Sequence, residues 1–354
     1  MQGRLLREKP AQSLSGNKCD RLCVMMHLNA SILSKKLSGL FSKKELKGKI
    51  HSRFQNAFNI ELDEGFLFNF LPEKLPPNPR SLLLPMIEWD KIHGLSPPVG
   101  LPVKIMGNQL EIPLIALEIS FGESELWDPS PSLPGPPIPD AEIHQNLEIV
   151  SMVVQQDYKR ADTEKNAHKT FYEAFQNRIC RAANNLSISI SNCNFEDISK
   201  NASQLVGLGS GLTPSGDDIL SGVMTAGVFC SMAYKVLYFD VQKINNRICS
   251  GAFGRTTIFS QILLGDSSMG EVVRPVGQLL QGLLCSKDKS SLIPLTREVM
   301  NLGGASGKDM LEGILLGIDA FLRLRDNLLR RHSWEGFPST CNPFSYIKSP
   351  LYKV

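Results

Sequence analysis

The sequence reads Gly207-Leu208-Gly209-Ser210-Gly211-Leu212-Thr213-Pro214-Ser215-Gly216-Asp217-Asp218 directly before an apolar run at 219–233. Alternating glycines allow the backbone to turn sharply and to approach another group closely. Thr213 or Ser215 can cap a helix, and Pro214 suits the first turn of one. The stretch therefore predicts a glycine-rich loop that leads into a helix at 217–235.

Helical spacing of apolar residues extends through the whole second half of the chain. The segments that show it are 141–159, 165–184, 217–235, 271–285 and 308–325. They predict a mostly helical domain at 141–332. The last residues, 333–354, contain three prolines and predict an irregular tail.

The first half has a different pattern. Of the 22 prolines, 15 fall between Pro72 and Pro139, which excludes long helices there. Apolar residues alternate with other residues at 58–62 and 66–70 around a turn at 63–65, and again at 103–114 around Gly107-Asn108. Alternation on both sides of a turn is typical of β-hairpins. These residues predict a small β domain, either a sheet or a barrel.

The fold class is therefore α+β, with a small N-terminal β domain followed by a mostly α-helical C-terminal domain. The predicted divisions are a flexible basic extension at 1–44, the β domain at 45–126, a Pro-rich connector at 127–140, the helical domain at 141–332 and the irregular tail at 333–354.

The net charge is unevenly distributed. Residues 1–50 contain 11 of the 38 Lys+Arg and 3 of the 35 Asp+Glu, a net charge of +8, whereas the other residues have a net charge of −5. A mildly acidic body argues against a nucleic-acid partner. The eight cysteines form no CxxC pair, which favours reduced thiols in a cytoplasmic protein.

No apolar run reaches the roughly 18 residues of a membrane-spanning helix, so no membrane partner is expected. The longest candidate, 219–233, is interrupted by Ser221, Gly222, Thr225 and Gly227. The N-terminal extension lacks the apolar core of a secretory signal, and an amphipathic targeting segment is the alternative interpretation.

The glycine-rich loop has the features of an anion site. A helix start presents unpaired N–H groups and the positive end of the helix dipole to a phosphate or carboxylate. Asp217 and Asp218 would repel a bare anion unless a cation, a basic side chain or a proton intervenes. The alternative is a well-capped helix with no ligand, since Ser215 and Asp218 are spaced as a capping box. Neither a P-loop nor a dinucleotide-binding motif matches the stretch.

A second segment resembles the first. Residues 306–313 repeat residues 215–222 at Ser, Gly, Asp, Leu and Gly, and both follow glycine-containing coil. Each predicted helix also has small residues four apart, which allow close approach of another helix. We therefore expect the two helices to cross near their N-termini, within roughly 15 Å, so that Asp218 and Asp309 flank one anion-binding pocket.

The third candidate is Gly254-Arg255-Thr256-Thr257. Arg255 beside two hydroxyls can bind a carboxylate or a phosphate through two hydrogen bonds. A surface arginine at a helix start is the alternative interpretation. The six histidines, including His51 near Asn59, are scattered and favour structural roles.

These motifs resemble the AllH-type subunit family of oxamate carbamoyltransferase. The resemblance rests on the 207–218 stretch, on His51-Ser-Arg-Phe54 with Asn59-Ile-Glu-Leu62, on Leu126-Trp-Asp-Pro129, on Arg255-Thr-Thr257 and on Gly304-Ala-Ser-Gly307. It covers about residues 45–325. The family usually has proline where this chain has Ser210.

The resemblance implies an activity and partners. The family member of anaerobic allantoin catabolism works with two other subunits, one of them similar to succinyl-CoA synthetase. That complex interconverts oxalurate plus phosphate and oxamate plus carbamoyl phosphate. For this chain the resemblance implies carbamoyl phosphate and oxamate as small anionic substrates, and synthetase-like subunits as partners.

The residues then take roles in a hypothesis. N–H groups of the 209–216 loop hold the phosphate, Arg255 holds the acceptor carboxylate, and Asp217 or Asp218 accepts a proton or binds a divalent metal. The further binding candidates are Gly209, Ser210, Gly211, Thr213, Ser215, Gly216, Thr256, Thr257, Ser306, Gly307 and Asp309. One alternative is a non-catalytic ligand-binding or scaffold subunit. Another is a metal-dependent hydrolase that uses Asp217, Asp218 and Asp309.

Overall fold

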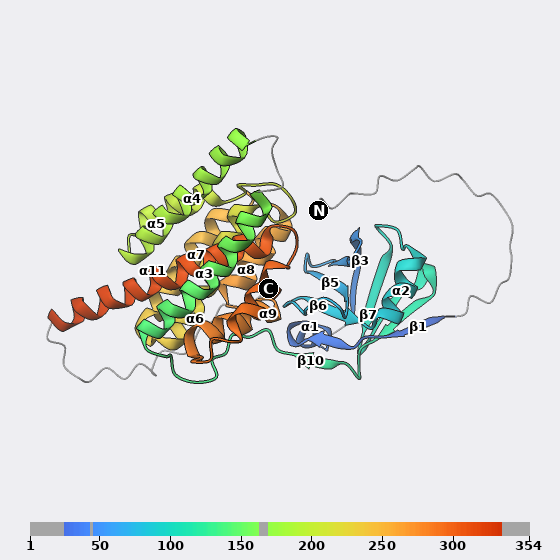
Figure 1. Ribbon diagram of the computed structural model, residues 1–354. Helices are drawn as coiled ribbons and strands as arrows, with labels where there is room; N and C mark the ends of the chain where they lie inside the picture. The colour runs from blue at the N-terminus through green and yellow to red at the C-terminus, as the bar shows by residue number, and fades with distance from the viewer. Residues whose placement is uncertain (1–24, 43–44, 163–168, 335–354) are drawn as a thin grey trace.

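The computed structural model describes residues 25–42, 45–162 and 169–334, which form a β domain and a helical domain (Figure 1). The predicted α+β class and the order of its two parts are confirmed. The strands are β1 (Met26–Asn29), β2 (Ile32–Ser34), β3 (Leu46–Phe54), β4 (Ala57–Leu62), β5 (Leu67–Pro72), β6 (Ser81–Leu84), β7 (Pro102–Met106), β8 (Gln109–Ile112), β9 (Leu117–Ser120) and β10 (Glu125–Trp127). The helices of this half are α1 (Lys35–Phe41), α2 (Met86–Leu95) and a 3₁₀ turn, η1 (Pro113–Ile115).

The strands form one curled sheet in the order β1-β9-β8-β7-β3-β4-β5-β6-β2-β10. β1 lies at one edge and β2 next to the other edge, yet only Ala30 and Ser31 separate them along the chain. The three Cα–Cα steps from Asn29 to Ile32 span about 11 Å at most, so the sheet must curl until its edges approach each other. Backbone bonds show this, because the Ala30 N–H donates to Ser120 O of β9 (2.8 Å) and the Ser31 N–H donates to Leu83 O of β6 (2.9 Å).

Apolar side chains fill the inside of the curl. Phe58, Ile60 and Leu62 are fully buried there, as their alternation predicted. α1 adds Phe41, whose ring lies 5.3 Å from the rings of both Phe68 and Phe121. Burial of large aromatic side chains is a major stabilising contribution in such a core.

The predicted flexible extension at 1–44 is wrong for residues 26–41, which form β1, β2 and α1. β1 and β2 have four and three residues, too short for alternation to be recognised. Both pair in parallel with strands about 90 residues away, a pairing without a local sequence signal. The rest of that extension (1–24, 43–44) lies outside the described residues, as does most of the predicted tail.

The second half consists of helices. They are α3 (Asp140–Asp162), α4 (Lys169–Ser191), α5 (Phe195–Leu205), α6 (Ser215–Ala233), the 3₁₀ turn η2 (Lys235–Leu237), α7 (Tyr238–Ala252), α8 (Ile258–Ser268), α9 (Arg274–Cys285), α10 (Leu292–Met300) and α11 (Ser306–Trp334). Among the described residues, no helix is long and apolar enough to cross a membrane.

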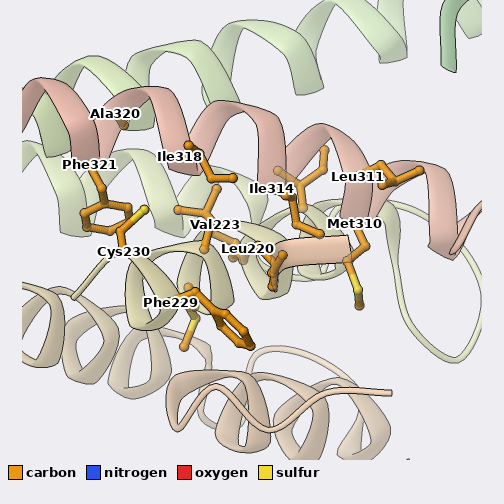
Figure 2. Packing of buried hydrophobic residues seen from close by; sticks show 14 of the residues in the cluster. Leu220, Val223, Phe229, Cys230, Met310, Leu311, Ile314, Ile318, Ala320 and Phe321 are labelled. Carbon is orange, nitrogen blue, oxygen red and sulfur yellow. The ribbon is translucent and has the colours of Figure 1, made fainter. Parts of the chain in front are cut away.

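α6 is the central helix of this half. It is buried on all sides over most of its length, which explains why it has no charged residue after Asp218. α11 packs along it, with Leu220 and Val223 of α6 facing Ile314 and Ile318 of α11 (Figure 2). The site motifs therefore lie at the starts of the two helices that build the core.

An ion-pair cluster joins the two halves. Asp266 of α8 accepts hydrogen bonds from Arg80 Nε (2.8 Å) and Nη2 (2.9 Å) and from Lys36 Nζ (2.7 Å). Glu271 also pairs with Lys36. Arg80 and Lys36 belong to the β domain, so the acids of the helical domain anchor the sheet against it.

Candidate functional site

The glycine-rich loop folds back over the start of α6. Gly209 has φ +134°, and a Cβ there would lie 2.5 Å from Ser215 N. A Cβ on Gly216 would lie 2.0 Å from Leu205 O, at the end of α5. Only glycine fits at both positions, because any side chain would overlap backbone atoms.

Part of the loop is exposed and has unpaired donors. Within the part of the chain that the structure describes, the N–H groups of Gly209, Ser210 and Gly211 make no hydrogen bond. These residues are exposed. The N–H of Gly216, in contrast, donates to Leu208 O (2.8 Å) and is unavailable to a ligand. The exposed tip of the predicted anion loop thus offers three unpaired N–H groups.

The predicted capping of α6 is wrong. Pro214 occupies the N-cap position, and no side chain caps the helix. Asp218, which the alternative interpretation paired with Ser215 in a capping box, instead accepts a hydrogen bond from the Thr213 hydroxyl (3.2 Å) and one from Ser306. The reason lies in tertiary structure, because the start of α11 supplies Ser306 as a partner for Asp218.

Asp217 supports the loop and faces away from Asp218. It is fully buried, and its Oδ1 accepts the N–H of Gly207 (2.9 Å) while its Oδ2 accepts the Thr256 hydroxyl. Thr257 caps α8 and donates to Leu212 O. Asp217, Thr256 and Thr257 therefore hold the loop in position, with both Asp217 oxygens already bonded within the protein.

Arg255 lies exposed beside the loop. Its Nη1 donates to Ser203 Oγ (3.0 Å) and Gly251 O (3.2 Å), and its Nη2 donates to Ser203 O (3.2 Å). These bonds orient the guanidinium on the ends of α5 and α7. Its Nε–H has no partner among the described residues and remains available for an anion.

α6 and α11 cross at glycines near their N-termini, as the repeated motif predicted. A Cβ on Gly222 would lie 2.2 Å from Met310 O, and one on Gly313 would lie 2.1 Å from Ile219 O. The two contacts are reciprocal, because Gly222 and Gly313 occupy equivalent places in the repeated motif, and so do Ile219 and Met310. Gly216 and Gly307 correspond as well. A Cβ on Gly307 would lie 1.9 Å from Val299 O at the end of α10, as one on Gly216 would meet Leu205 O at the end of α5.

The side chains at the two helix starts are also exchanged reciprocally. Ser306 of α11 hydrogen-bonds Asp218 of α6, and Ser215 of α6 hydrogen-bonds Asp309 of α11. The Thr213 and Ser306 hydroxyls lie 3.0 Å apart. The structure thus brings Asp218 and Asp309 together beneath half-buried hydroxyls, and we call these two residues the acid pair.

Burial changes the protonation of Asp218. Asp218 is 1% exposed. Burial raises its pKa from 3.8 to about 8, the neighbouring Asp309 and Asp217 add to the rise, and the hydroxyls of Ser306 and Thr213 oppose it. Asp218 is therefore predominantly neutral at pH 7 and can donate a hydrogen bond.

Asp309 is shifted less. Burial raises its pKa from 3.8 to about 6, Glu312 adds to the rise, and Ser215 and Lys308 oppose it. Asp309 is therefore mostly ionised at pH 7. Its Oδ2 is buried and has no hydrogen-bond partner. An unpaired buried carboxylate oxygen is costly unless a ligand or water satisfies it.

These shifts predict how stability depends on pH. A carboxyl group with a pKa raised on folding binds more protons in the folded protein, so the free energy of unfolding falls as pH rises from about 4 towards 8. Asp218→Asn removes this titration, and we expect the variant to gain a few kcal/mol relative to the wild type between pH 5 and pH 8.5. Urea unfolding of both proteins at the two pH values measures the difference. Parallel pH profiles would contradict the raised pKa.

The predicted metal set is not assembled. Asp217 is bonded to Gly207 and Thr256, on a different side of α6 from the acid pair. Across residues 25–42, 45–162 and 169–334, no three His, Cys, Asp or Glu side chains are grouped so that they could hold a metal ion. Asp217, Asp218 and Asp309 therefore do not form the metal site that the hydrolase alternative requires.

Sequence reasoning undervalued the polar residues of β3 and β4. The pairing of β3 with β4 shifts in register between Ile50 and Ser52, and at this point His51 Nδ1 lies 3.1 Å from Ser52 Oγ. Asn59 Nδ2 donates to the same oxygen (2.9 Å). The His51 ring meets Phe259 of α8 edge-on at 5.8 Å. β-Bulges often redirect side chains in this way, but a bulge has no recognisable sequence signal here.

Comparison with known families agrees with these motifs. Residues 205–318 match the family described as oxamate carbamoyltransferase subunit AllH, and residues 28–126 match the AllH family N-terminal domain. No curated protein and no solved structure matches the chain. The first match contains the glycine-rich loop, the acid pair and Arg255, and the second spans nearly all of the curled sheet. Because the two matches together cover more than half of its length, the chain belongs to the AllH family of oxamate carbamoyltransferase subunits.

Proposed function

We propose that this chain is the carbamoyl-transfer component of a multi-subunit oxamate carbamoyltransferase, acting on carbamoyl phosphate and a small acceptor of the oxamate type. The observation that carries the proposal is an exposed glycine loop with unpaired N–H groups, beside the acid pair and the unpaired Nε–H of Arg255. The family membership supports the reaction class and the presence of other subunits. Synthetase-like partners are what the sequence resemblance implies.

The loop tip and Arg255 take the anionic groups. The N–H groups of Gly209, Ser210 and Gly211 donate hydrogen bonds to a phosphate, and Arg255 Nε–H donates to an anionic oxygen. As the acceptor nitrogen forms a bond to the carbamoyl carbon, the carbon–oxygen bond to phosphate breaks and phosphate leaves with the electron pair. Fixed donors that stabilise this developing charge are the main source of rate enhancement.

The test is transfer by the reconstituted complex. Arg255→Ala is expected to lower turnover by about 10²-fold or more, the typical effect of losing a donor to a developing oxyanion. Arg247→Ala is the matched control, since Arg247 is an exposed arginine that also hydrogen-bonds α5, through Phe195 O (3.4 Å) and Ser199 Oγ (3.3 Å). We expect that control to retain full turnover.

A ligand-holding subunit without its own chemistry is the second candidate. It is favoured by the use of Asp217, Thr256 and Thr257 within the protein, which removes one predicted catalytic residue and two predicted binding residues. In that case Arg255→Ala weakens binding of carbamoyl phosphate, while turnover at saturating substrate stays unchanged. The transferase proposal fails if saturation restores the wild-type rate.

A further inference from the structure

The acid pair combines a hydrogen-bond donor with a hydrogen-bond acceptor. Asp218 and Asp309 come from the starts of two crossing helices and face each other across hydroxyls of Ser215 and Ser306. Asp218 already receives hydrogen bonds from Thr213 and Ser306, so its carboxyl group has two donors facing it. Asp309 is 7% exposed, and its Oδ2 has no partner. The unmatched group at this place is thus a single acceptor oxygen.

We infer that the acid pair is a binding subsite for a primary amide, in which Asp309 Oδ2 accepts an amide N–H and the Asp218 carboxyl donates to the adjacent C=O. The inference rests on the proposed function, because it assigns the amide end of the acceptor to this subsite. A primary amide presents one N–H donor and one C=O acceptor side by side, the complement of one ionised and one protonated carboxyl group.

Access to the subsite is through the two coil segments above it. Residues 209–212 and 303–305 are exposed, and Ser215 and Ser306 between them are half-buried. An amide that enters there takes the place of the Ser215 hydroxyl at the Asp309 carboxylate. The ligand's carboxylate end then lies towards the exposed loop tip, where unpaired N–H groups are available.

The same contact gives the reacting nitrogen a proton acceptor. When the amide nitrogen forms its bond to the carbamoyl carbon and phosphate departs, the N–H proton passes to Asp309 Oδ2. A carboxylate with a pKa of about 6 is well matched to that role near neutral pH. Asp217, which the sequence offered as an alternative proton acceptor, has both oxygens bonded elsewhere.

The test compares two probes that differ in the amide. Oxamate has an amide and a carboxylate, whereas oxalate has two carboxylates and no N–H. Calorimetric titration of the full-length chain at pH 7 should show oxamate binding roughly tenfold or more tighter than oxalate, as expected for one hydrogen bond to a charged group. Equal binding of the two probes, or no binding of oxamate, overturns the inference.

Two isosteric variants separate acceptor from donor. Asp309→Asn removes the charged acceptor and can turn an NH₂ group towards oxalate, so the preference for oxamate should fall to about twofold or less. Asp218→Asn keeps a neutral donor and should retain the preference within about threefold. Circular dichroism confirms that both variants are folded. An unchanged preference in Asp309→Asn overturns the assignment.

The pH profile provides a readout that a structural role would not give. Oxamate binding should weaken below about pH 6 as Asp309 takes up a proton, and this loss should be absent in Asp309→Asn. The charged groups around the pair are Asp217 near Asp218, and Glu312 and Lys308 near Asp309, with Lys308 also paired to Asp157 of α3. If oxamate binding by Asp309→Asn weakens below pH 6 as it does in the wild type, the role of Asp309 is overturned.

These outcomes are distinguishable from those of the proposed function. Probe binding uses the chain without partner subunits, whereas carbamoyl transfer requires the complex. Preferential binding of oxamate without transfer by the complex would overturn the proposed reaction and leave the amide subsite intact. Transfer by the complex without any preference of the chain for oxamate over oxalate would overturn the amide subsite and leave the proposed reaction intact.

Discussion

Replacement of Gly313 by alanine is expected to destabilise the protein by about 3 kcal/mol or more, although alanine normally favours a helix over glycine. The added Cβ would lie 2.1 Å from the backbone oxygen of Ile219, a distance at which α6 and α11 must move apart. Movement of these helices disturbs the contacts of Leu220, Val223 and Ile314 in the core (Figure 2). Urea unfolding measured by circular dichroism gives the free-energy change.

Gly265→Ala is the matched control. Gly265 also lies inside a helix, α8, but a Cβ there would meet nothing within 4 Å. We expect this variant to be stabilised by about 0.5–1 kcal/mol because alanine restricts the unfolded chain and favours the helix. Similar effects of the two substitutions would show that the helices do not cross at Gly313.

Loss of the Asp266 carboxylate is expected to have the second-largest effect. Asp266 is 6% exposed and binds Arg80 through both oxygens and Lys36 through one. In Asp266→Ala, Lys36 retains Glu271, whereas Arg80 loses the carboxylate that it binds. Breaking a largely buried pair typically costs about 3–5 kcal/mol. Because Lys36 and Arg80 are 26% and 18% exposed, we expect about 2–4 kcal/mol.

The neighbouring ion pair provides the control for this prediction. Lys35 pairs with Asp128 at 2.9 Å, but both side chains are about half exposed. Asp128→Ala should cost less than about 1 kcal/mol, since solvent screens an exposed pair. Thermal unfolding of the two variants should differ in form as well, with separate transitions for the two domains only in Asp266→Ala. Equal losses in the two variants would show that the buried cluster does not couple the domains.

The order and type of the main elements could be predicted because they depend on local pattern. Phe58, Ile60 and Leu62 alternate and are buried in β4, and the apolar run after Asp218 forms a helix that is buried on all sides. The crossing of α6 and α11 was also predictable, because Gly222 and Gly313 occupy equivalent places in a repeated motif. Close helix approach requires small residues, and small residues are visible in a sequence.

Other features had no local signal. β1 and β2 were missed because their partners, β9 and β10, lie about 90 residues further along the chain. Asp217 and Asp218 look equivalent in sequence, but successive helix residues point about 100° apart. That rotation directs Asp217 to Gly207 and Thr256 and directs Asp218 to Ser306.

The α+β class, the helix pairing and the family can be inferred from the amino-acid sequence, since periodicity, small residues and the long glycine motif are properties of neighbouring positions. Tertiary structure directs Asp217 to the loop and Asp218 to the acid pair, because the partners of each side chain come from other elements. It also decided the protonation of Asp218 and Asp309, because desolvation depends on atoms that come from the other helix. Local sequence patterns therefore predict the main helices and strands, whereas the crossing of α6 with α11 determines the protonation of the acid pair.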